Sequence, residues 1–154
     1  MDSYAQLRGL SAEELRRPIK VKFIGENGID AGGLRRAWFD MLGRCMFHAD
    51  YGDGFQPNKD KDDGDGDGFR LFSDKNDGDG FHPNENSHVK PDHLRLFEFF
   101  GKIVAKAVYD GQYLPASFSP VFCKLILGRP VNLEDMKIFD PVIHKSMTDI
   151  LNEY

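Results

Sequence analysis

Apolar residues recur along most of this chain at steps of three and four positions, the spacing that gathers side chains on one face of an α-helix. The spacing predicts two long helices, over Leu34–Met46 and Pro91–Asp110. Two further helices are predicted, over Pro120–Leu127 and from Asp140 toward the C-terminus. A glycine follows the second and the third of these helices, as is common at helix ends. The chain is therefore expected to be mostly helical.

Each long helix is predicted to bury one apolar face. In the first helix this face consists of Leu34, Trp38, Met41, Leu42 and Cys45. In the second helix it consists of Leu94, Phe97, Gly101, Val104 and Val108, and it is widened by Phe100, Ile103 and Ala107. The second helix is therefore expected to be buried over much of its circumference.

Shorter elements are predicted from local signals. Ser11 and Glu14 have the spacing of a capping box, which predicts the start of a short helix. Ile19–Phe23 alternates apolar residues with lysines, which predicts a half-buried strand. The apolar islands Phe69–Phe72 and Phe81 are predicted to form a two-stranded hairpin. The expected fold class is α+β, mostly α.

The segment between the first long helix and the hairpin has a different composition. Residues 53–68 are rich in Asp and Gly and have too little apolar surface to offset the entropy of ordering, which predicts a mobile insertion. Between Lys59 and Asp79, eight aspartates stand against four basic residues, so this segment carries most of the net charge of −5. The remainder of the chain is nearly neutral. It lacks the stripe of basic residues that binding to nucleic acid requires, so no nucleic-acid partner is expected.

Length and cysteine content narrow the class of protein. A chain of 154 residues is expected to form one domain with a sizeable core. Cys45 and Cys123 lack metal-ligand spacing and lie in predicted helices, where we expect buried, protonated thiols and a reducing compartment. No apolar run approaches the roughly 20 residues that a membrane helix needs, and the N-terminus lacks signal-peptide features. We expect an intracellular protein, cytoplasmic or nuclear, with no membrane partner.

Several motifs, in a fixed order, carry a resemblance to one family. The stretch Lys22–Phe39 reads "KFIGENGIDAGGLRRAWF", an apolar run followed by a glycine-rich acidic turn and a helix. Phe97–Gly111 reads "FEFFGKIVAKAVYDG", and Phe118–Val131 follows it. Together they resemble the N-terminal lobe of HECT-type ubiquitin ligases. The likeness covers Ile19–Leu151 apart from the acidic insertion, and Ala37 departs from the glutamate usual in the family.

The resemblance implies that residues 1–154 form a partial HECT domain, the large subdomain of its N-terminal lobe. The family is an enzyme family, transferases that pass ubiquitin from a conjugating enzyme through a cysteine thioester to substrate lysines. The implied partners are therefore ubiquitin, a ubiquitin-conjugating enzyme and protein substrates. The family's catalytic cysteine lies near the C-terminus of the domain, so we expect no catalytic residue in this chain and no activity of the chain alone.

A calcium-binding or protein-interaction module is the alternative interpretation, based on the Asp-rich loop. Four aspartates have the spacing of oxygen ligands in an EF-hand loop, with Gly68 at its turn position: Asp63, Asp65, Asp67 and Asp74. The last ligand is Asp where the motif has Glu, and Arg70 replaces an apolar residue. At most weak calcium binding is expected, and no other cofactor is predicted.

Overall fold

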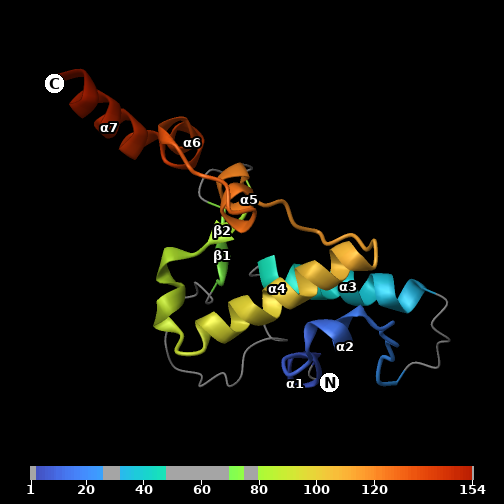
Figure 1. Cartoon of the computed structure of the whole chain (residues 1–154). Helices are drawn as coiled ribbons and strands as arrows, with labels where there is room; N and C mark the ends of the chain where they lie inside the picture. Colours follow the sequence, from blue (N-terminus) through green and yellow to red (C-terminus); the bar gives the residue numbers. More distant parts are fainter. Residues whose placement is uncertain (1–2, 26–31, 48–69, 75–79, 154) are drawn as a thin grey trace. The chain divides into compact units, whose positions relative to one another are not determined.

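The computed structural model describes the chain in four ranges, residues 3–25, 32–47, 70–74 and 80–153 (Figure 1). The chain divides into two compact units, which we call unit 1 (within residues 1–71 and 85–115) and unit 2 (within 72–84 and 116–154). Helices dominate both units, and the described residues contain one two-stranded sheet. The predicted fold class, α+β and mostly α, is confirmed. The predicted insertion, residues 53–68, lies outside the described ranges.

Unit 1 is built from helices. Its elements are α1 (Ser3–Leu7), α2 (Ala12–Arg16), α3 (Gly33–Phe47), the 3₁₀ helix η2 (Glu85–Val89) and α4 (His93–Tyr109). The two predicted long helices are α3 and α4, and the predicted capping box starts α2. There the Glu14 amide donates to Ser11 Oγ at 3.3 Å, and the Ser11 amide donates to the Glu14 carboxylate at 2.8 Å.

The core of unit 1 lies where α1, α3 and α4 meet. Its buried residues are Leu7, Trp38, Phe39, Leu42, Phe99, Ile103 and Ala107. Phe39 and Ile103 are fully buried, and the ring of Tyr4 in α1 meets that of Phe99 edge-on at 5.1 Å between centroids. Figure 1 shows α3 and α4 beside one another, and the Phe47 and Phe100 rings pack between them. The two long helices therefore form the rigid part of unit 1.

The strand predicted over Ile19–Phe23 is wrong, because these residues form no strand. Their apolar side chains are half-buried against the core, and the two lysines between them are exposed. The alternation thus predicted correctly which side chains face the core. A strand also needs a regular ladder of hydrogen bonds to a neighbouring strand, which an alternating pattern alone does not provide.

The predicted faces of the two long helices need correction. In α4, Leu94 and Val108 are 70% and 77% exposed, and in α3 Met41 is 43% exposed. The residues that α4 buries are Phe99, Phe100, Ile103, Lys106 and Ala107. Apolar residues surround much of α4, so their spacing does not single out the buried side. Contacts with the other helices determine which side is buried. The buried side includes Lys106, which a count of apolar residues does not identify.

Unit 2 begins with the predicted hairpin. Strand β1 (Phe72–Ser73) pairs antiparallel with β2 (His82–Pro83), with Phe72 opposite Pro83 and Ser73 opposite His82. Phe81 also bridges to Phe118: its amide donates to the Ser117 carbonyl at 2.7 Å, and its carbonyl accepts from the Ser119 amide at 3.0 Å. A hairpin at the predicted place is confirmed, with its second strand at His82–Pro83 rather than at Phe81. Phe81 instead forms the bridge to the segment that leads into the next helix.

Three helices complete unit 2. They are α5 (Pro120–Ile126), α6 (Leu133–Phe139) and α7 (Pro141–Glu153). The pattern predicted α5 and α7 but missed α6, although Asn132 and Asp135 form a capping box at its start. The rings of Phe72, Phe118 and Phe122 cluster between the hairpin and α5. None of the described helices has the length and apolar character required to cross a bilayer.

Candidate functional site

The last helix of unit 2 exposes its apolar side chains to solvent. No residue of α7 is buried, and Ile143, Met147 and Ile150 are 43%, 45% and 58% exposed. Their spacing of four and three places them on one face of the helix. Other exposed apolar residues of unit 2 precede it: Leu125, Ile126, Leu127, Val131 and Ile138. Exposed apolar surface of this extent is typical of a surface that contacts another protein segment.

The ends of α5, α6 and α7 are fixed by side-chain caps. Ser119 Oγ accepts from the Phe122 amide at 3.2 Å, and Asp140 Oδ1 accepts from the Ile143 amide at 3.0 Å. Lys124 of α5 donates to Asp135 Oδ1 of α6 at 2.5 Å. These bonds satisfy backbone groups at the helix starts, and one of them joins α5 to α6. The helices that carry the exposed apolar residues are therefore well defined locally.

The ion pair between α5 and α6 makes the stability of unit 2 depend on pH. The hydrogen bond from Lys124, with that from the Asn132 amide, holds the pKa of Asp135 below its ordinary value of 3.8. A lowered folded-state pKa contributes stability above the unfolded-state value, and this contribution disappears as pH falls through the folded-state pKa. We therefore expect the loss below the ordinary value of 3.8, measured by urea unfolding followed by circular dichroism.

Two variants test the source of this pH dependence. In Asp135→Asn the ionisable group is absent, so unfolding free energy should fall less steeply at acidic pH than in the unmodified chain. Lys124→Met should also flatten the profile, because the Asp135 carboxylate loses its first hydrogen-bond donor and its folded-state pKa moves back toward the ordinary value. A profile unchanged by both substitutions would show that this pair does not couple stability to pH.

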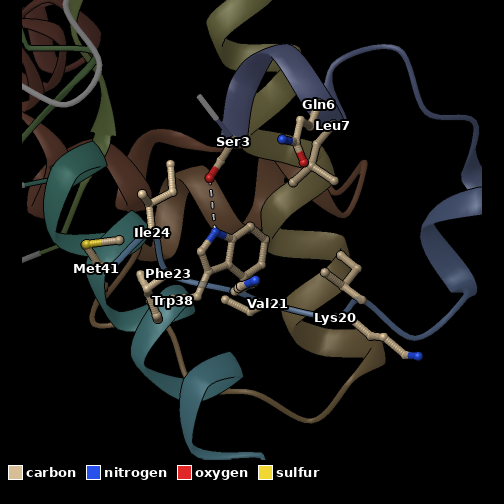
Figure 2. Close-up of a pocket in the computed structure, with 11 residues that line it drawn as sticks. Ser3, Gln6, Leu7, Lys20, Val21, Phe23, Ile24, Trp38 and Met41 are labelled. Atoms are coloured by element: carbon tan, nitrogen blue, oxygen red, sulfur yellow. Dashed lines mark hydrogen bonds between the residues drawn. The ribbon is translucent and has the colours of Figure 1, made fainter. Parts of the chain in front are cut away.

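A pocket of about 360 Å³ lies in unit 1, between α1, residues 19–24 and α3 (Figure 2). Figure 2 shows the Trp38 indole within it, and the indole Nε1–H donates to Ser3 Oγ at 3.1 Å. Lys20 and Lys22 contribute to the lining, which is otherwise mainly apolar. The described lining contains no carboxylate, imidazole or thiol, the groups that most often perform acid–base or thiol chemistry.

A buried ion pair lies at the C-terminal end of α4. Lys106, whose side chain is 1% exposed, places Nζ 2.7 Å from Asp110 Oδ1 and donates to the Arg17 carbonyl at 3.0 Å. Asp110 Oδ2 is buried, and none of the residues that the structure describes forms a hydrogen bond with it. The sequence analysis did not predict this pair, and the available signal was a lysine among the apolar residues 103–109 with an aspartate four residues later.

The predicted calcium site is not tested by the structure. Asp63, Asp65 and Asp67 lie outside the described residues, and Asp74 lies within them with an exposed side chain. In the described ranges, no three His, Cys, Asp or Glu side chains are grouped so that they could hold a metal ion. Calcium binding by the Asp-rich loop stays a prediction.

Both cysteines are free and half-buried, in α3 and α5. The prediction of buried thiols therefore needs correction, because both residues are only partly buried. Burial nevertheless raises the pKa of the Cys45 thiol. Because the thiolate is the nucleophilic form, a raised pKa makes Cys45 less reactive at neutral pH.

Comparison with known proteins gives consistent matches. The profile of the HECT-domain (ubiquitin-transferase) family matches residues 67–154. The E3 ubiquitin-protein ligase TOM1 of Saccharomyces cerevisiae is 38% identical over 152 residues, which are 98% of this chain and 4% of that protein. The ligase ptr1 of Schizosaccharomyces pombe is 37% identical over 99% of the chain, and UPL1 of Arabidopsis thaliana is 39% identical over 97%. The chain spans about 4% of the length of each of these relatives.

Proposed function

Because this chain belongs to the HECT-domain family of ubiquitin transferases, we propose that it is the N-terminal-lobe scaffold of a HECT ubiquitin ligase. The complete ligase would take ubiquitin from a conjugating enzyme onto a cysteine and pass it to lysines of protein substrates. In this proposal the chain supplies no catalytic group. It supplies a rigid platform from α3 and α4 and an exposed apolar face on α7 for other parts of the ligase.

The accessibility and ionisation of the two cysteine thiols distinguish a scaffold from a catalyst. A transthiolation step needs an accessible thiolate, which attacks the carbonyl carbon of the incoming thioester and releases the thiol of the conjugating enzyme. The chain has two cysteines, both half-buried in helices. Burial raises the pKa of Cys45, which disfavours the nucleophilic form. Cys45 therefore lacks the surroundings of a reactive cysteine.

The apolar face of α7 supports the second half of the proposal. A scaffold needs a surface on which a neighbouring part of the ligase can pack, and Ile143, Met147 and Ile150 present such a surface on one helix face. The charge-neutral character of this face suits burial against another apolar surface. The caps at Ser119 and Asp140 hold the helices that carry it.

A chimera tests the scaffold role directly. The segment of TOM1 that aligns with this chain is replaced by the chain, and ubiquitin thioester formation and substrate ligation are measured with purified conjugating enzyme. We expect the chimera to retain both activities. A chimera that melts cooperatively but forms no ubiquitin thioester would contradict the proposal. Met147→Asp within the chimera should reduce transfer, and Lys145→Asp on the opposite side of α7 serves as the matched control.

The isolated chain tests the absence of catalysis. Incubated with activating enzyme, conjugating enzyme and ubiquitin, it should form no adduct that a reducing agent removes. An adduct that disappears in Cys45→Ser or Cys123→Ser would make the chain itself a ubiquitin carrier and would overturn the scaffold proposal. We also propose an intracellular location, cytoplasmic or nuclear, because thiol-based transfer needs a reducing compartment and both cysteines are free.

A further inference from the structure

The segment Arg8–Arg17, here called the strap, is attached to unit 1 in an unusual way. Its central helix α2 has five residues and buries none of them. A helix this short is not stable in isolation, because one turn does not offset the cost of nucleation. Nevertheless α2 lies against α4. Something other than burial of α2 must therefore hold the strap in place.

Two lysines of α4 hold the strap at its two ends. Lys102 Nζ donates to the Arg8 carbonyl at 2.6 Å, and Lys106 Nζ donates to the Arg17 carbonyl at 3.0 Å. The two lysines are four residues apart, so they lie on the same face of α4, one turn from each other. A hydrogen bond with a charged donor is stronger than one between neutral groups. The strap is thus fastened through its backbone at both ends.

The segments on either side of the strap are held differently. Before it, Leu7 is buried in the core; after it, Ile19 and Val21 pack against the same core. Within the strap, Leu10 is half-buried against the core and Leu15 is half-buried. Apolar burial therefore fixes the flanks, while the strap itself contributes two half-buried apolar side chains.

The surroundings of Lys106 lower the cost of opening. Lys106 also contacts Asp110 Oδ1 at 2.7 Å, so its charge keeps a partner when the Arg17 carbonyl leaves. Asp110 Oδ2 is buried and has no hydrogen-bond partner among the described residues while the strap is closed. Opening would admit water to this oxygen and to the Arg17 carbonyl. Hydrogen bonds to water would then replace the hydrogen bonds that are lost.

We propose that the strap opens and closes on α4 as one unit while the rest of unit 1 stays folded, with Lys102 and Lys106 as its two fasteners. This local equilibrium belongs to the fold itself and does not depend on the role in ubiquitin transfer. Opening makes the buried Lys106–Asp110 pair accessible to solvent without dismantling the α3–α4 core.

Hydrogen exchange of the whole chain, resolved by NMR, tests this proposal. The Leu15 and Arg17 amides donate within the strap, to the carbonyls of Ser11 and Glu14. We expect these amides to exchange by local opening and faster than the amides of the buried part of α4. Lys102 is partly exposed and does not belong to the buried ion pair. In Lys102→Met the strap amides should exchange about tenfold faster than in the unmodified chain, while the exchange rates of the α4 amides stay unchanged.

Two further variants complete the test. Lys106→Met should accelerate strap exchange by at least the same factor, and if it does not fold, Lys102→Met alone decides. Lys124→Met, which removes the ion pair to Asp135 in unit 2, is the matched control and should leave strap exchange unchanged. Strap amides that do not respond to Lys102→Met, or α4 amides that accelerate by the same factor, would overturn the proposal.

Discussion

Replacing Trp38 with alanine should lower the free energy of unfolding by about 3–5 kcal/mol, the usual cost of removing a large aromatic side chain from a core. Trp38 is 6% exposed and lies edge-on to Phe39, with ring centroids 4.8 Å apart. Its indole also donates to Ser3 Oγ, which ties α1 to α3. The measurement is urea unfolding followed by far-UV circular dichroism, because the substitution removes the single tryptophan.

Two controls separate the contributions of Trp38. Trp38→Phe keeps much of the apolar surface but loses the hydrogen bond to Ser3, so it should cost less than Trp38→Ala. Met41→Ala lies on the same helix at a position that is 43% exposed, and it should cost less than about 1 kcal/mol. If Trp38→Ala and Met41→Ala were equally destabilising, α3 would not pack against α1 and α4 through Trp38.

Replacing Gly80 with alanine should destabilise unit 2 by about 2–4 kcal/mol, from left-handed backbone strain together with a steric clash. Gly80 has a φ of +95°, and an added Cβ would lie 2.7 Å from the Phe118 carbonyl carbon. That carbon belongs to the backbone of the segment paired with Phe81, so it cannot move aside as a flexible side chain would. Loss of NMR signals from the hairpin and a lower unfolding midpoint are the expected observations.

Gly128→Ala is the matched control for Gly80→Ala within the same unit. Gly128 also has a positive φ, +64°, but an added Cβ would meet no atom of the described residues within 4 Å. The substitution should therefore cost only the conformational strain, about 1–2 kcal/mol. Equal destabilisation by the two substitutions would mean that the close approach to Phe118 contributes nothing, and that backbone conformation alone requires glycine at position 80.

Elements with strong local signals were predictable from the sequence. The starts of α2 and α5 follow from Ser11 and Ser119, whose side chains cap the helices as expected. The ends of α4 and α5 follow from the glycines after them, which adopt positive φ. By contrast, α1 and α6 have five and seven residues, too few for a helical period to stand out.

The details of burial and of the candidate site depended on contacts distant in sequence. Lys106 can be buried because the Arg17 carbonyl and the Asp110 carboxylate accept hydrogen bonds from its ammonium group, and residues 17 and 106 are far apart in the chain. A pattern read locally treats a lysine as exposed. The family was predictable because its ordered motifs, such as Phe97–Gly111, are specific. The predicted calcium ligands of the Asp-rich loop remain untested.

The bridge between Phe81 and Phe118 has a consequence for the order of events on the ribosome. The hairpin strands β1 and β2 emerge first, and all of η2 and α4 must be synthesised before Ser117–Ser119 can pair with Phe81. At typical translation rates of roughly 5–20 residues per second, this interval lasts seconds. During this interval the edge of the hairpin is not yet paired with residues 117–119, and the ring of Phe72 is not yet packed against Phe118 and Phe122. The nascent chain therefore has a defined period in which a chaperone can bind.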